Sequence, residues 1–216
     1  MRTDYNYCSI IEYVPRKCSA NEEQVRNRNL VYDCKKGKWS SEIKTKFQEQ
    51  INKLTSSQPT STFILCSIPA STKEKTRNRY FNFINDLSRN CNVINGYQCI
   101  EPINDQESSH VVGKTADPTS NFKFERSLIS GKHVILIDDV ITRGTTFNRT
   151  SDRLIKEGAL SVNGIFLAKT INYGTYGDTG IDWLSELQYG DPDAEAEEQH
   201  VLDVLTGEYE EYDDFF

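Results

Sequence analysis

The feature that most constrains this chain is an apolar run, Val134 to Ile137, followed directly by the two aspartates Asp138 and Asp139. A short, continuous apolar run predicts a strand that is buried on both faces, as in a parallel sheet. We expect this strand to end at the two acids and a hydroxyl-rich loop around one glycine to follow. A helix from Phe147 to Lys156, ending near Gly158, is expected after that loop.

Strand, acid pair, loop and helix in this order form a candidate cradle for a phosphorylated sugar. The amides of the loop and the N-terminus of the helix attract a phosphate, and Gly144 lets the backbone approach it closely. The two aspartates can accept hydrogen bonds from a ribose diol. Further hydroxyl donors come from the threonines of the loop, Thr142, Thr145 and Thr146.

Two common nucleotide-binding loops do not fit this stretch. A Walker loop requires G-x-x-x-x-G-K-[ST], but no lysine lies between Asp138 and Lys156. A dinucleotide-binding loop requires G-x-G-x-x-G, but this loop has one glycine. The candidate cradle is therefore of another kind.

Val134 to Thr146 resembles the signature of the type I phosphoribosyltransferases, without a departure across its thirteen positions. These proteins bind 5-phosphoribosyl-1-pyrophosphate (PRPP). The resemblance implies Mg²⁺-dependent transfer of the phosphoribosyl group to a nitrogen acceptor, here unidentified, with release of pyrophosphate. It implies that Asp138 and Asp139 are catalytic residues holding the ribose hydroxyls. The 5-phosphate would be held by Thr142, Arg143, Gly144, Thr145 and Thr146. Some relatives only sense PRPP, so turnover stays open.

A second strand, loop and helix lie upstream. Phe63 to Ile68 is predicted to be a buried strand, and a helix is expected from about Glu74 to Arg89. The loop between them is similar in placement to the pyrophosphate loop of the family, and its candidate residues are Ala70, Ser71, Thr72 and Lys73. Arg79 is a further pyrophosphate candidate, and the alternative for it is a solvated charge on the helix.

The remaining periodic segments predict an α/β fold in which a mostly parallel central sheet is flanked by helices. An amphipathic helix is expected around Trp39 to Leu54, whereas Asn21 to Arg28 is a short helix or a loop. Further strands are predicted at Tyr5–Tyr13, Val93–Ile100, Phe122–Phe124 and Ser161–Lys169. We divide the chain into an N-terminal cover (1–60), a phosphoribosyltransferase-like core (61–170) and an acidic tail (171–216).

Glu101 to Asn121 is polar and is not expected to hold regular structure. The family carries a flexible loop at this place that closes over PRPP, and the resemblance makes His110 and Lys114 candidate contacts. The alternative is a solvated loop whose charges are incidental.

Charge separates the tail from the body. All 25 Lys and Arg residues lie at or before Lys169 together with 18 of the 32 acids, so that part carries +7, while the tail carries 14 acids and no base. The tail is either a solubilising segment or an element that docks on the body or on a protein partner. The basic body would attract nucleic acid non-specifically. Candidate partners are thus PRPP, a protein, nucleic acid and, in a homodimer, a second copy of the chain.

We expect a cytoplasmic protein without a membrane segment. No apolar run approaches the ~20 residues of a membrane span, and the first residues have no apolar signal core. The six cysteines include no C-x-x-C pair, which favours reduced, mostly buried thiols over a zinc site.

Within the superfamily the chain is most similar to the ComF-like competence proteins. Lys36-Gly37 precedes the Trp39 helix, and Arg79-Tyr80-Phe81-Asn82 stands where that group has Arg-Gly-Phe-Asn. The chain departs by Tyr80 in place of the glycine and by lacking the paired-cysteine zinc motif. This resemblance implies an alternative function, a non-catalytic PRPP sensor or an accessory protein of DNA processing or defence.

Overall fold

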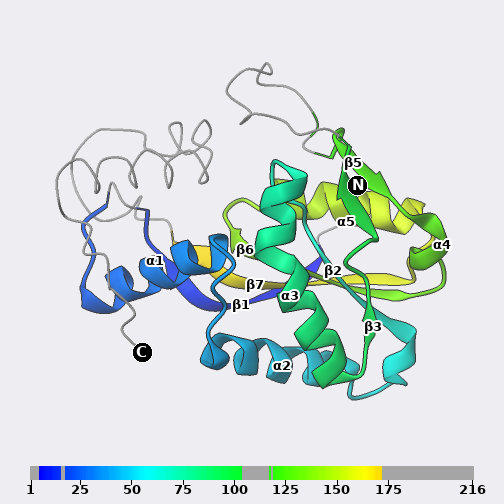
Figure 1. Cartoon of the computed structure of the whole chain (residues 1–216), viewed down its shortest axis with the longest axis horizontal. Coiled ribbons are helices and arrows are strands. Elements are labelled where there is room, and N and C mark those ends of the chain that lie inside the picture. Colours follow the sequence, from blue (N-terminus) through cyan, green and yellow to red (C-terminus); the bar gives the residue numbers. More distant parts are fainter. Residues whose placement is uncertain (1–4, 16–17, 104–116, 118, 172–216) are drawn as a thin grey trace. The chain divides into compact units, whose positions relative to one another are not determined.

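The computed structural model describes residues 5–15, 18–103, 117 and 119–171 (Figure 1). A five-stranded sheet has the order β1-β7-β6-β2-β3, and every neighbouring pair is parallel. Its strands are β1 (Asn6–Tyr13), β2 (Phe63–Ser67), β3 (Ile94–Asn95), β6 (His133–Ile141) and β7 (Ser161–Thr170). The predicted α/β fold with a parallel central sheet is confirmed.

The central strands are apolar because helices cover both faces of the sheet. All five residues of β2 are buried, and so are Val134 to Ile137 of β6. Side chains alternate between the faces, so that Ile135 and Ile137 belong to one apolar core and Val134 and Leu136 to the other.

One face of the sheet carries three helices, α1 (Glu22–Lys35), α2 (Ser41–Thr55) and α3 (Lys73–Cys91). Aromatic side chains join them. Trp39, just before α2, stacks on Phe83 of α3 with ring centroids 3.7 Å apart, and Phe47 of α2 meets Phe83 edge-on at 5.1 Å. Asn21 caps α1 with a capping box, so the expected short helix or loop is a full helix that runs on through the apolar patch to Lys35.

The other face carries α5 (Thr145–Lys156) and the short helix α4 (Arg126–Ile129). Phe147 of α5 meets Phe166 of β7 edge-on at 5.3 Å, over Gly164. A Cβ atom at Gly164 would lie 2.8 Å from the Phe147 ring, so only glycine allows this approach. Beside α4, a two-stranded antiparallel sheet pairs β4 (Ile100–Pro102) with β5 (Phe122–Phe124). The short 3₁₀ helix η1 (Thr60–Thr62) precedes β2.

Three expected boundaries are wrong. The strand predicted to end at the two acids continues through them to Ile141, because Val140 and Ile141 still pair with Ala168 and Lys169 of β7. The helix expected from Phe147 begins at Thr145. The strand expected from Val93 to Ile100 is interrupted by a turn between β3 and β4, and β4 places regular structure at Glu101 and Pro102.

All the described helices and strands belong to one compact unit. Residues 1–60 contribute an edge strand of its sheet, and the proposed division at residues 60 and 170 stays a prediction. Among the described residues, no helix is both long enough and apolar enough to span a membrane. All six cysteines are free thiols, and Cys34, Cys66, Cys91 and Cys99 are buried.

Candidate functional site

The candidate site lies at the carboxyl edge of two neighbouring strands, β2 and β6. Ser67 of β2 is in register with Ile137 of β6, and the Ile68 amide donates to the Ile137 carbonyl at 3.0 Å. Because the strands are parallel, the loop after β2 and the acid pair of β6 emerge at the same edge of the sheet. This is the edge at which parallel α/β sheets bind ligands.

Asp139 is buried and ion-paired. Its side chain is 8% exposed, and its Oδ2 lies 2.9 Å from Nη1 of Arg79 on α3, whose side chain is 6% exposed. The other oxygen, Oδ1, accepts a hydrogen bond from the Val140 amide at 2.6 Å. Both carboxylate oxygens of Asp139 are therefore engaged within the protein.

Asp138 is partly exposed and bound differently. Its Oδ1 accepts hydrogen bonds from the Tyr80 hydroxyl at 2.6 Å and from the Asp139 amide at 2.8 Å. Burial, followed by the negative charge of Asp139, raises the pKa of Asp138 to about 8, although the Tyr80 hydrogen bond and Arg79 act in the opposite direction. The carboxyl of Asp138 is therefore largely protonated at neutral pH.

Tyr80 is fully buried, and its hydroxyl is the donor in the bond to Asp138. Burial raises the pKa of Tyr80 well above its usual value, and the charges of Asp138 and Asp139 act in the same direction. The phenol consequently keeps its proton.

The predicted phosphate loop is short. Thr142 and Arg143 are exposed, and Gly144 is the N-cap of α5 with φ +72° and ψ 11°. No side chain caps this helix, so the amides of its first turn are not used by a capping residue. Thr145 and Thr146 open the helix itself rather than the loop. The arrangement is suited to an anion, because first-turn amides and the helix dipole both favour negative charge.

The predicted pyrophosphate loop precedes α3, which begins at Lys73, and internal hydrogen bonds hold it. Thr72 caps α3 by accepting from the Lys75 amide at 3.0 Å. The Thr76 hydroxyl accepts from the Ala70 amide at 3.0 Å and donates to the Thr72 carbonyl at 2.7 Å. Ala70 is buried, Ser71 and Thr72 are half-buried and Lys73 is exposed.

Arg79 is not the solvated helix charge considered as its alternative, because it is buried against Asp139. Its role toward pyrophosphate stays a prediction. Sequence reasoning missed the contact of Tyr80 with Asp138, because Tyr80, Ile84 and Leu87 share an apolar stripe that indicates packing and nothing more. The only signal at this position was the departure from glycine in the Arg79-Tyr80-Phe81-Asn82 motif.

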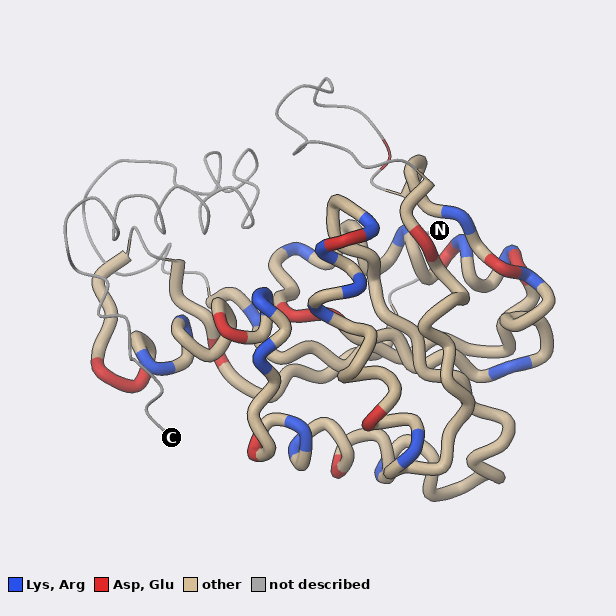
Figure 2. Tube along the Cα trace, in the orientation of Figure 1, with Lys and Arg blue, Asp and Glu red and all other residues tan. Residues whose placement is uncertain are grey.

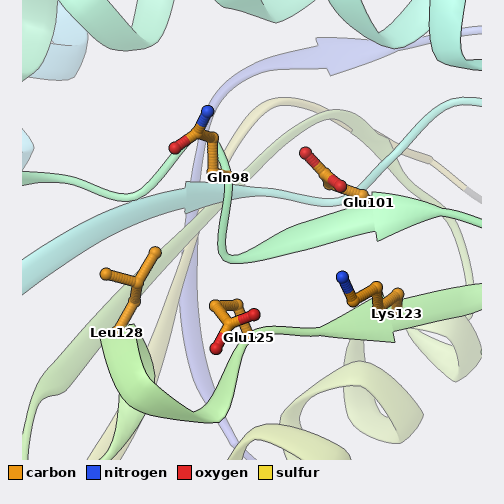
Figure 3. A pocket seen from close by; sticks show the side chains of 5 residues that line it. All are labelled: Gln98, Glu101, Lys123, Glu125 and Leu128. Atoms are coloured by element: carbon orange, nitrogen blue, oxygen red, sulfur yellow. The ribbon is translucent and has the colours of Figure 1, made fainter.

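The two flexible-loop candidates, His110 and Lys114, lie outside the described residues. The described chain on either side of that segment forms β4 and β5. Next to these strands is a polar cavity of roughly 200 Å³ (Figure 3). Its lining residues are Gln98, Glu101, Lys123, Glu125 and Leu128.

Within the described part of the chain, no group of three or more His, Cys, Asp or Glu side chains could hold a metal ion. Mg²⁺ does not require such a cage, since it ordinarily keeps several waters and takes oxygens from substrate phosphates. The open carboxyl edge with its two loops therefore fits Mg²⁺ carried by a phosphorylated ligand, not a site built by the protein alone.

No known family model and no curated protein matches this chain. Among solved structures, the chain is similar to a variant of hypoxanthine phosphoribosyltransferase from Trypanosoma cruzi in a ternary substrate complex. The identity is 13% and the TM-score 0.40, over 71% of this chain and 87% of that one. The chain is also similar to a hypoxanthine-guanine-xanthine phosphoribosyltransferase, with 16% identity and a TM-score of 0.37 over 65% of this chain and 70% of that one. For an adenine phosphoribosyltransferase the identity is 16% and the TM-score 0.38, over 71% of this chain and 79% of that one.

Proposed function

We propose that this protein binds PRPP with Mg²⁺ at the carboxyl edge of β2 and β6 and transfers the 5-phosphoribosyl group to a nitrogen acceptor. One observation carries the proposal. The acid pair near the end of β6, the uncapped N-terminus of α5 and the loop before α3 all lie at the carboxyl ends of two neighbouring parallel strands. The signature resemblance of Val134–Thr146 supports assigning the acid pair and the residues at the start of α5 to ribose and phosphate.

In this proposal each part of PRPP has its own partner. The 5-phosphate takes the amides and hydroxyls from Thr142 to Thr146, with Arg143 adding positive charge. The ribose hydroxyls meet the acid pair. The pyrophosphate faces the loop from Ala70 to Lys73, where Lys73 supplies charge. Mg²⁺, when bound together with the phosphorylated ligand, would offset the charge of the leaving pyrophosphate.

The reaction forms a bond from the acceptor nitrogen to C1 of the ribose while the bond from C1 to the pyrophosphate oxygen breaks, and pyrophosphate leaves with that electron pair. The transition state has oxocarbenium character, and no side chain needs to form a covalent bond. The protein contributes by positioning the sugar and by stabilising charge.

Calorimetric titration with PRPP in the presence of Mg²⁺ tests the proposal. At a pH above about 8, where Asp138 is ionised, we expect saturable binding by the wild type. Binding by Asp138→Asn should be weaker by about tenfold or more, because asparagine cannot offer a charged acceptor to the sugar. Asp86→Asn is a matched control, because Asp86 forms a partly exposed ion pair with Lys44 away from the site. Absence of PRPP binding by the wild type would contradict the proposal.

Turnover needs a separate measurement. Release of pyrophosphate from PRPP is followed with a panel of nucleobases and amines, and release with one acceptor supports transfer. Binding without release by any acceptor would favour the alternative, a non-catalytic PRPP sensor or ComF-like accessory protein. We further propose a cytoplasmic location, a homodimer, and a protein or nucleic-acid partner.

A further inference from the structure

Two short motifs that are distant in the sequence meet beside the acid pair. Gly37, in the link between α1 and α2, has φ +80°, and a Cβ atom there would lie 2.3 Å from the carbonyl oxygen of Asn78 on α3. Glycine therefore lets this link lie directly on the backbone of α3. The Lys36-Gly37 and Arg79-Tyr80 motifs are in this way parts of one structure.

Arg79 is held at both ends, by the link and by the last residue of α1. The Trp39 indole Nε1 donates to the Arg79 carbonyl at 2.7 Å, and Nε of Arg79 donates to the Lys35 carbonyl at 3.3 Å. With backbone and guanidinium both restrained, Nη1 is directed at Asp139. Breaking a buried pair of this kind leaves an uncompensated charge away from water. Asp139 is consequently poorly suited to bind a sugar hydroxyl.

Tyr80, the next residue of α3, contacts Asp138, the other acid of the pair. Its hydroxyl and the Asp139 amide both donate to Oδ1 of Asp138. Both of these hydrogen bonds engage Oδ1 of Asp138 and leave Oδ2 out. The carboxyl is thus fixed in orientation through one oxygen, and Asp138 is the member of the pair that is partly exposed.

We propose that Arg79 and Tyr80 are positioning residues that divide the acid pair between two tasks. Arg79 commits Asp139 to a structural ion pair, and Tyr80 orients Asp138 so that its second oxygen meets the ligand. The inference rests on the proposed function for the identity of the ligand, a ribose hydroxyl of PRPP. It departs from the sequence expectation that both acids hold the diol.

The groups facing Asp138 define what its titration should report. Asp139 faces it from β6, and Arg79 and Tyr80 face it from α3; Cys34 of α1 lies within electrostatic reach of Asp139. Burial, followed by the charges of Asp139 and Asp33, raises the pKa of the Cys34 thiol well above its usual value, so it stays neutral. Asp138 therefore lies beside the ion pair of Arg79 with Asp139, and it gains its own charge around pH 8.

Tyr80→Phe tests the orientation of Asp138 without PRPP. The carboxyl carbon of Asp138 is followed by ¹³C NMR during a pH titration of the wild type and the variant. We expect a wild-type midpoint near pH 8 and a higher one in Tyr80→Phe, because the phenol stabilises the carboxylate. The control Tyr5→Phe removes the hydroxyl bonded to Asp152 and should leave the midpoint unchanged. An unchanged midpoint in Tyr80→Phe would overturn the role of Tyr80.

PRPP affinity should follow the same titration. A carboxylate accepts a stronger hydrogen bond from a sugar hydroxyl than a protonated carboxyl does. PRPP binding should therefore tighten about tenfold as pH rises through the midpoint of Asp138. The rise should move to higher pH in Tyr80→Phe and vanish in Asp138→Asn. If PRPP affinity in Tyr80→Phe rises at the same pH as in the wild type, the inference is wrong.

A double-mutant cycle tests the division of tasks. Asp139→Asn and Arg79→Met are each expected to lower the denaturation midpoint, and the double variant should lose less than the sum of the two. Asp138→Asn should not lower the midpoint, but it should lose PRPP affinity. The division is wrong if Asp139→Asn is as stable as the wild type but fails to bind PRPP. The NMR titration and the double-mutant cycle need no PRPP. If only the proposed function is wrong, both measurements should therefore still give the expected results, while the wild type does not bind PRPP.

Discussion

At the scale of single residues, Asp138 contributes a pH-dependent part of the stability of this protein. Its pKa is about 8 in the folded chain against 3.8 ordinarily, because burial and the Asp139 charge disfavour its ionised form. Between these two values the folded state holds a proton that the unfolded state has released. The contribution of Asp138 to stability is therefore lost as pH rises from about 4 to about 8.

Asp138→Asn should remove this loss of stability at high pH. Asparagine can still accept the Tyr80 hydrogen bond but has no charge to bury. We expect the variant to be more stable than the wild type at pH 9, by roughly 1–3 kcal/mol, and to show a flatter dependence between pH 5 and 9. Urea denaturation across this range measures it. Parallel stability curves for the two proteins would show that Asp138 does not titrate in this way.

How much of the site the sequence predicts depends on how far apart in the sequence the contacting residues are. Asp138, Asp139 and Gly144 are predictable because strand, acids and loop are adjacent in the chain. The contacts from Arg79 to Asp139 and from Tyr80 to Asp138 join residues 60 and 58 positions apart. They depend on how α3 docks on the sheet, which in turn depends on Gly37 and Trp39. No local pattern contains that information.

At the scale of elements, the N-terminus of α5 depends on glycine at position 144. Its φ of +72° lies in the left-handed region, but a Cβ atom there would meet only ordinary contacts at 3.5 Å or more. Gly144→Ala should therefore cost about 1 kcal/mol through the backbone alone. It should also weaken PRPP binding, since the first-turn amides of α5 would move.

Gly131→Ala is the matched control for that substitution. Gly131 has φ +74°, a Cβ atom there would meet nothing within 4 Å, and the residue lies before β6 rather than after it. We expect a similar loss of stability in both variants by thermal denaturation but a loss of PRPP affinity in Gly144→Ala alone. Equal PRPP affinities would mean that the 5-phosphate does not bind at this helix.

The element boundaries show where local reading of the sequence fails. β2, β6 and β7 are predicted by apolar runs because both faces of each strand are buried. The expected strand from Val93 to Ile100 fails because Gly96 approaches β2 too closely to continue in register. Its amide donates to the Leu65 carbonyl, and a Cβ atom there would lie 2.6 Å from Sγ of Cys66. That contact is set by tertiary structure.

At the scale of the whole molecule, net charge is unevenly distributed along the chain. Lys and Arg are interleaved with Asp and Glu over the described elements (Figure 2). The full chain carries −7, while residues 1–171 keep all 25 bases and 18 of the 32 acids.

A chain ending at Ile171 should bind polyanions that the full chain binds weakly. Its net charge of +7 favours phosphate contacts, and that attraction falls as salt rises. Fluorescence anisotropy with a labelled DNA duplex at about 50 and about 150 mM salt measures the effect. Thermal denaturation of the same two chains shows whether residues 172–216 stabilise the body. Equal DNA affinity for both chains would show that the tail does not oppose nucleic acid.

The most direct test of the account compares two sugars that differ by one hydroxyl. Ribose 5-phosphate and 2-deoxyribose 5-phosphate are titrated calorimetrically into the wild type and Asp138→Asn at a pH above about 8, where Asp138 is ionised. In this account Asp138 accepts a hydrogen bond from the ribose diol, and the loop before α5 binds the phosphate. The wild type should therefore prefer ribose 5-phosphate by about tenfold, and the variant should show almost no preference. Equal affinity of the wild type for both sugars, or an undiminished preference in the variant, would contradict the account.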